Sequence, residues 1–136
     1  GLPSPFLLDT PLDPLWVVDD PGAEVIGRYP SGGVAVAAKQ TPDGLRVYIG
    51  ALHCPARLLR NIAAASGAHV YINSDDVVLS DGRFLSITAT AQGRKRLFLP
   101  RSCTVTYALT GGVVAENVTE MDVDLDIGET RLYLLQ

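Results

Sequence analysis

The sequence has little charge and no concentrated basic region. Charged residues make up 19% of the 136 residues, and the net charge is −4, whereas an ordinary globular domain carries ~25% charged residues. Binding to nucleic acid requires clustered Lys and Arg that displace counterions from phosphates. The eleven basic residues are scattered, and only Arg94, Lys95 and Arg96 stand together, at the start of an expected strand. The composition therefore argues against a nucleic-acid partner and is consistent with burial of part of the surface against another domain or subunit.

Cysteine is also scarce, with only Cys54 and Cys103 in the chain. A structural metal site normally needs three or four ligands at short, repeated spacings, and a disulfide-stabilised small domain needs more cysteines than two. Two free, partly buried thiols are therefore expected, with no metal and no cofactor.

Long apolar runs are absent as well. No run approaches the ~18–20 residues of a membrane span, and no basic-then-apolar signal peptide opens the chain. These absences indicate a soluble chain without a membrane partner and leave its compartment open. Because the chain begins with Gly1 rather than Met, we expect a processed product, a tag remnant or a piece of a longer protein.

Acidic residues occur in groups that could suggest chemistry, but each group has a simpler interpretation. The run Asp122-x-Asp124-x-Asp126 fails as a calcium loop, because Ile127 and Tyr133 stand where such a loop needs Gly and Glu. The pairs Asp19-Asp20 and Asp75-Asp76 are interpreted as caps of backbone N–H groups, since the two acids of a glycosidase must flank a sugar.

The first half of the chain reads as a short antiparallel meander followed by one amphipathic helix. Strands are expected at 15–18, 23–29, 34–40 and 45–52, and Thr41-Pro42-Asp43-Gly44 is a well-specified hairpin turn. Pro55 and Gly67 are suited to the two ends of the helix. Its apolar side is expected to include Leu58, Leu59 and Ile62.

From His69 onward the apolar residues alternate with period two. Strands are expected at 69–73, 77–79, 84–90, 94–99, 103–109, 118–127 and 130–135, separated by Gly and Asp turns. This spacing predicts an antiparallel β-sandwich. The fold class is therefore mostly β (α+β), divided into residues 1–68 with the meander and helix and residues 69–136 with the sandwich. The positions expected to face the core include Leu85, Ile87, Ala89, Leu97, Leu99, Met121, Val123, Leu125 and Ile127.

Few residues qualify as site candidates, and no catalytic, cofactor-binding or metal-ligating residue is predicted. His53 and Cys54 adjoin at the expected helix N-terminus, where the pKa of a thiol can be lowered, but no partner completes a catalytic set. Trp16 and Tyr71 are candidates for contact with carbohydrate or with a protein interface. Trp16 is expected to pack on a neighbour, with sugar stacking as the alternative. The chain's Trp and Tyr residues are too dispersed in sequence to predict a sugar-binding line.

Several segments together resemble one family of proteins. The segments are Ala23–Tyr29, Ala37-Ala38-Lys39, Val47–Gly50, Leu58–Ala63, Ser66–Tyr71, Asp75–Val78 and Gly128–Tyr133. In this order they resemble the C-terminal region of bacterial multidomain glycoside hydrolase-like proteins of the β-galactosidase type. The resemblance implies that residues 1–68 end an amidotransferase-like domain, often used for trimerisation, and that 69–136 are the terminal β-sandwich.

The resemblance carries over no catalytic residue, because the catalytic acids of such enzymes belong to a barrel that this chain lacks. Thr88 also stands where the resemblance leads us to expect a histidine. The first hypothesis is a non-catalytic accessory and assembly domain whose partners are neighbouring domains or subunits, as in a homo-oligomer. The alternatives are a carbohydrate-binding module and a small enzyme that uses His53 and Cys54.

Overall fold

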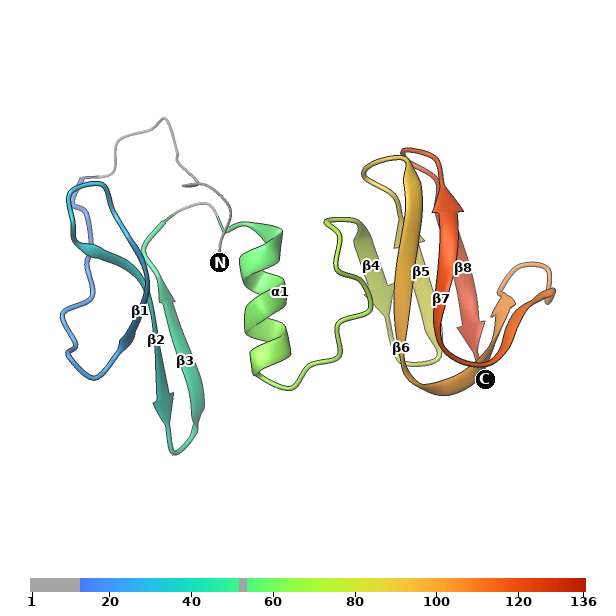
Figure 1. Cartoon of the computed structure of the whole chain (residues 1–136), viewed down its shortest axis with the longest axis horizontal. Coiled ribbons are helices and arrows are strands. Elements are labelled where there is room, and N and C mark those ends of the chain that lie inside the picture. The colour runs from blue at the N-terminus through green and yellow to red at the C-terminus, as the bar shows by residue number, and fades with distance from the viewer. Residues whose placement is uncertain (1–12, 52–53) are drawn as a thin grey trace. The chain divides into compact units, whose positions relative to one another are not determined.

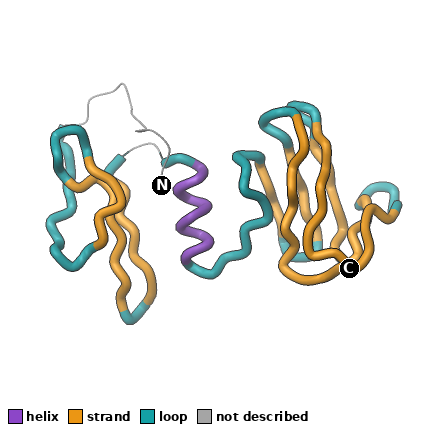
Figure 2. Tube along the Cα trace, viewed as in Figure 1, coloured by secondary structure: helices purple, strands orange, loops and turns teal. Residues whose placement is uncertain are grey.

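The computed structural model describes residues 13–51 and 54–136 of the chain. The chain divides into two compact units, Gly1–Ala68 and His69–Gln136. Within the described residues, the first unit contains three strands and a helix, and the second contains five strands. Figure 1 and Figure 2 show how these elements follow one another along the chain. All strand pairs are antiparallel. The predicted fold class is therefore confirmed.

The sheet of the first unit has the order β1-β2-β3, with β1 at Glu24–Arg28, β2 at Val34–Thr41 and β3 at Gly44–Ile49. The predicted hairpin between β2 and β3 forms, and Gly44 has φ +130°, a conformation that favours glycine. The strand predicted at 15–18 is wrong, because these residues belong to no strand. Pro14 and Pro21 flank this segment and lack N–H donors, and Val18 N donates to Val34 O at 3.1 Å.

Helix α1 spans Ala56–Ala65, with Pro55 as its N-cap and Gly67 at φ +86° just after its end. Leu58 is buried and forms a small core with Ala35 and Val36 of β2. Ile62 packs against the same core, but Leu59 is 54% exposed, so the apolar side predicted for the helix was too wide. Leu59 is one residue beyond Leu58 and therefore points about 100° away around the helix axis.

The second unit contains one sheet of five strands in the order β4-β5-β8-β6-β7. These strands are β4 at Val77–Ser80, β5 at Phe84–Thr88, β6 at Gly93–Tyr107, β7 at Val113–Leu125 and β8 at Thr130–Leu135. The sequence predicted two strands at 94–99 and 103–109, and the structure joins them into β6. Its pairing with β7 becomes irregular between Phe98 and Cys103, around Pro100, which has no N–H to donate.

The irregular middle of β6 lets the sheet fold over its own core. The first half of β6 pairs with the end of β7, while Val105–Tyr107 pair with β8. The inward side chains of these strands meet in one core. Each fully buried large aliphatic side chain contributes roughly 1.5–3 kcal/mol. The central members are Leu85, Ile87, Leu97, Val105 and Tyr133.

Two further expectations for this unit are wrong. Residues 69–73 make only the isolated bridge between Ile72 and Leu97, because the chain bends at residues 73–75. Ile127 is 73% exposed rather than buried, because β7 ends at Leu125 and Ile127 lies in the turn before Gly128.

Candidate functional site

The two predicted contact residues lie in different units. Trp16 is 71% exposed, so the expectation that its side chain packs on a neighbour is wrong; its carbonyl oxygen accepts a hydrogen bond from the Tyr29 hydroxyl at 3.3 Å. Tyr71 is half-buried, packs edge-on against His69 with ring centroids 4.6 Å apart, and accepts a hydrogen bond from Ser80 Oγ at 3.1 Å. Tyr71 is therefore held by its own unit, and the exposed ring is that of Trp16.

The reactive pair suggested by the sequence is only partly described. His53 lies outside the described residues. Cys54 is half-buried and packs against the small core around Leu58, with its Sγ 4.0 Å from Pro55 O. Reactivity of this thiol with His53 as a partner stays a prediction.

A buried ion pair lies inside the second unit. Lys95 Nζ lies 3.1 Å from Asp76 Oδ2, and the two side chains are 9% and 0% exposed. Oδ1 of the same carboxylate accepts hydrogen bonds from Thr90 N at 2.8 Å and from Thr90 Oγ1 at 3.2 Å. Ser74 Oγ donates to Oδ2. Both carboxylate oxygens therefore have two partners each, so the buried charge is fully compensated.

These partners decide the pKa of the Asp76 carboxyl. Burial alone raises the pKa, but the hydrogen bonds from Ser74, Thr90 and Lys95 outweigh it and lower the pKa to about 2. The group is consequently an anion at neutral pH. Asp76 precedes β4, and its carboxylate contacts Thr90 just after β5 and Lys95 in β6. Its role is therefore to hold these segments together rather than to transfer a proton.

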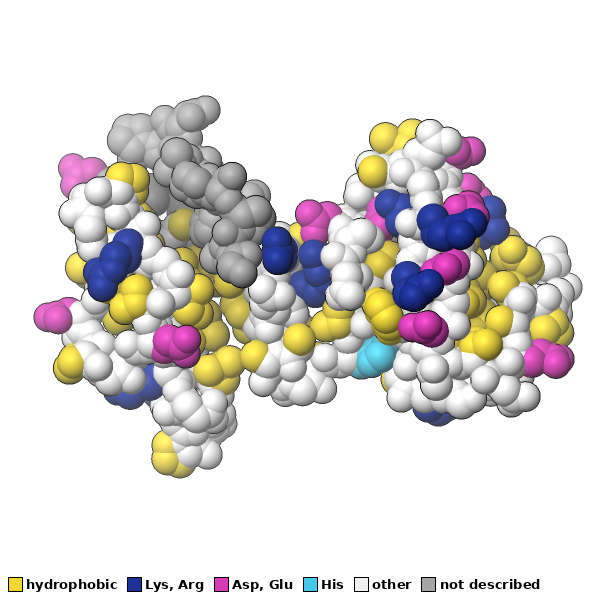
Figure 3. Space-filling model, viewed as in Figure 1, with side chains coloured by type: hydrophobic (Ala, Val, Ile, Leu, Met, Phe, Trp, Pro, Cys, Tyr) yellow, Lys and Arg dark blue, Asp and Glu magenta, His cyan; other side chains and the backbone are white. Residues whose placement is uncertain are grey.

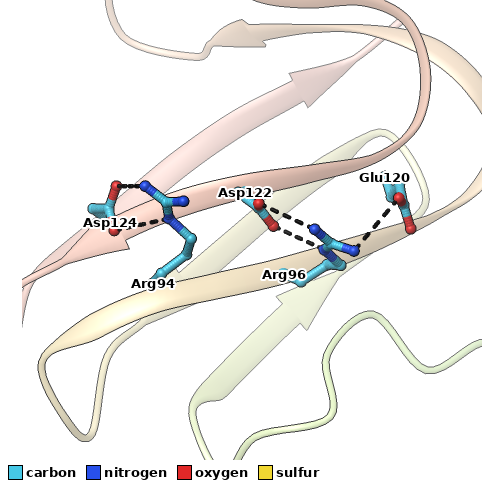
Figure 4. Close-up of polar contacts among 5 residues, drawn as sticks. All are labelled: Arg94, Arg96, Glu120, Asp122 and Asp124. Atoms are coloured by element: carbon cyan, nitrogen blue, oxygen red, sulfur yellow. Dashed lines mark hydrogen bonds and ion pairs between the residues drawn. The ribbon is translucent and has the colours of Figure 1, made fainter.

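The charged outer face of β6 and β7 lies on the opposite side of these strands. Arg96 Nε lies 2.9 Å from Asp122 Oδ1, Arg94 Nε lies 3.4 Å from Asp124 Oδ1, and Arg96 also reaches Glu120 at 3.7 Å (Figure 4). Figure 3 shows Lys/Arg and Asp/Glu side chains side by side on this unit. The three Asp residues of the run predicted not to bind calcium thus lie on a solvated strand face or in the turn beyond it. Among the described residues, no group of three His, Cys, Asp or Glu side chains could hold a metal ion.

The outer face of β4, β5 and β8 has a different character. Pairing places Leu79 opposite Ser86, Val77 opposite Thr88 and Phe84 opposite Leu134. Val77, Leu79 and Phe84 are 52%, 69% and 41% exposed. We call this the uncharged face, since its outward positions along the three strands carry only apolar and hydroxyl side chains: Val77, Leu79, Phe84, Ser86, Thr88, Thr130, Leu132 and Leu134. Thr88, the position where a histidine was expected, shares a hydrogen bond of 2.8 Å with Thr130.

A third cluster lies where β6 and β8 pair. The rings of Tyr107 and Tyr133 stack with centroids 5.6 Å apart, although they are distant in sequence. Arg131 lies 2.7 Å from Glu129 and donates to the Tyr107 hydroxyl at 3.1 Å, beside an open hollow of about 410 Å³. Burial raises the pKa of Tyr133. The cation here is already held by its own carboxylate, so the cluster stabilises the strand pair.

The comparisons with known proteins give one structural similarity. No family model and no curated protein sequence matches the chain. The crystal structure of β-galactosidase from Bacillus circulans sp. alkalophilus has a similar fold over 85% of this chain, with a TM-score of 0.52 and 14% sequence identity. The chain spans 18% of the length of that enzyme chain. At this identity the similarity concerns the fold alone. Within the described residues, no helix has the length and apolar character required to cross a membrane.

Proposed function

We propose that this chain is a non-catalytic accessory and assembly part of a glycoside hydrolase-like protein. In this proposal, Gly1–Ala68 corresponds to the end of an amidotransferase-like domain and His69–Gln136 to the terminal β-sandwich. The fold similarity to part of a β-galactosidase supports this context. The observation that carries the assembly role is the uncharged face of β4, β5 and β8.

The uncharged face favours contact with a second copy of the same chain. Three of its large apolar side chains, Val77, Leu79 and Phe84, are more than one-third exposed, and contiguous exposed apolar surface of this kind marks interaction sites. In an isologous contact each face meets its own copy. The outward strand positions of this face carry no charge and bring no like charges together in such a contact, although the whole chain has a net charge of −4. The Arg83 guanidinium adjoins the face, 5.9 Å from the centre of the Phe84 ring.

The acidic side chains support the non-catalytic part of the proposal. The general acid of a glycosidase needs a raised pKa. Hydrogen bonds to cations or to backbone N–H groups instead lower the pKa of Asp20, Asp81, Asp122 and Glu129, and that of Asp76 as described above. We expect no hydrolysis of nitrophenyl β-galactoside by the purified chain. Hydrolysis that disappears when one of these acids is replaced would contradict the proposal.

The assembly role is tested by amide NMR spectra recorded over a wide range of chain concentration. We expect concentration-dependent shifts for residues such as Leu79, Ser86 and Leu132, because these lie on the uncharged face. Arg96 and Asp122 on the charged outer face serve as internal controls and should not shift. Shifts of equal size on both faces, or none on the uncharged face, would count against this interface.

A further inference from the structure

The first unit contains a hollow of about 390 Å³ on one face of its sheet, a volume within the usual range for small-molecule sites. The hollow lies between the segment that precedes β1 and strands β2 and β3, and its lining includes Ala23 and Ala37. These small side chains leave the space that larger residues would fill. Strand pairing sets Ala37 opposite Tyr48 and Lys39 opposite Arg46, so all four residues project from the same face of the sheet.

Tyr48 supplies an exposed aromatic surface to this hollow. Its side chain is 40% exposed and its ring lies close to Gly50. A Cβ at Gly50 would be 3.2 Å from Tyr48 Cε1 and would clash with the Tyr29 hydroxyl, so only glycine allows these two tyrosines to approach here. The Tyr29 hydroxyl in turn donates to the carbonyl of Trp16. Tyr48 thus lines the hollow with a side chain that solvent can reach.

Both cations that line the hollow lie beside a carboxylate, although Asp43, the partner of Arg46, is outside the lining. Lys39 Nζ lies 2.6 Å from Asp20 Oδ2, and Arg46 lies 3.4 Å from Asp43. Asp20 is fixed further by Gly22 N, which donates to its Oδ1 at 2.9 Å. Each cation therefore has its own carboxylate. The result is an array of donors and acceptors around an aromatic ring that gives no preference to an anion or a cation.

We propose that this hollow binds a neutral pyranose sugar. The apolar face of the sugar ring would lie on Tyr48, whose side chain offers an apolar body and a polar tip. Asp20 would accept hydrogen bonds from sugar hydroxyls, and Lys39 and Arg46 would donate to them, since hydrogen bonds to charged groups are the stronger ones. The sequence did not indicate this site, because its residues come from three separate segments. The inference is independent of the assembly proposed for the second unit.

Calorimetric titration of the full chain with methyl β-galactoside and with cellobiose tests the inference, and glucuronate serves as the charged comparison. We expect saturable binding of at least one neutral sugar, weakened about tenfold by Tyr48→Ala through loss of the aromatic contact. Tyr48→Phe keeps the ring and should retain binding. Tyr71→Ala, which alters a tyrosine of the other unit, should bind as the unaltered chain does.

Three results would overturn the inference. The first is the absence of saturable heat with both neutral sugars. The second is equal affinity in Tyr48→Ala, which would remove the hollow as the binding place. The third is binding of glucuronate alone, which would show a site for anions. Circular dichroism of each variant identifies a loss of binding that comes from unfolding. Arg46→Gln then decides the question, because this side chain is 71% exposed and its replacement removes a donor of the hollow: weakened binding is expected, and unchanged binding would overturn the inference.

Discussion

Lys95 and Asp76 form an ion pair of 3.1 Å inside the sandwich, with both side chains buried. Lys95 occupies an inward position of β6, between the outward Arg94 and Arg96. Asp76 precedes β4 and receives the additional hydrogen bonds from Ser74 and Thr90. This pair connects the start of the second unit to its longest strand. The buried charge of each side chain is compensated only when the other side chain is present.

Replacing Lys95 with Met should destabilise the chain by about 3 kcal/mol, because it leaves the buried Asp76 carboxylate without its cation. Urea unfolding followed by circular dichroism measures this change. The matched control is Arg94→Met, one residue earlier on the exposed side of the same strand. It breaks an ion pair that solvent already screens, so its stability should stay close to that of the unaltered chain. Equal losses in the two variants would contradict the importance assigned to the buried pair.

The Asp76 carboxyl should titrate at a pKa of about 2 when its side-chain carbon is followed by NMR. The folded-state pKa is lower than the unfolded value of 3.8. Stability from this group is therefore fully present above about pH 4 and is lost as the pH falls toward 2, by about 2 kcal/mol in total. A titration midpoint at 3.8 or above would show that the partners do not stabilise the anion.

Gly50→Ala should destabilise the first unit by about 1–3 kcal/mol, since the added methyl group meets the Tyr29 hydroxyl, Trp16 O and the Tyr48 ring. Fluorescence of Trp16, the chain's single tryptophan, reports unfolding of this region. Gly112→Ala is the control, because its added methyl group has only ordinary contacts at 3.6 Å and beyond and its φ is not positive. Unchanged stability in Gly50→Ala would mean that the aromatic residues around Gly50 are not closely packed.

Alternation and turn chemistry were sufficient to predict most of the second unit. Leu85 and Ile87 lie where period two placed them, and β8 has the bounds that were predicted. Ile127 shows the limit of this reasoning, since the alternation continues past the residue where strand pairing stops. The two separate strands predicted at 94–99 and 103–109 were wrong, because both segments belong to β6 and both pair with β7, on either side of the irregular pairing around Pro100; the second segment also pairs with β8.

The candidate sites were harder to predict from the sequence than the strands. Lys95, Leu97 and Leu99 are spaced two residues apart, so their side chains point to the same face of β6. The alternation therefore implied that Lys95 points inward, where its charge needs a carboxylate partner. Nothing in the spacing identified Asp76 as that partner, because the two are brought together only by the folded sheet. The same holds for Tyr48 and Asp20, whose proximity depends on how the segment before β1 crosses the sheet.

Sedimentation equilibrium of the isolated chain over a wide concentration range tests the assembly role most directly. The account predicts that the mass rises from 14.5 kDa toward twice that value as the concentration increases. Leu79→Lys puts a charge on the uncharged face and should remain at the lower mass. Leu109→Lys alters a side chain that is 88% exposed in the turn after β6 and should associate as the unaltered chain does. A mass that stays at 14.5 kDa throughout, or association that Leu79→Lys leaves intact, would contradict the account.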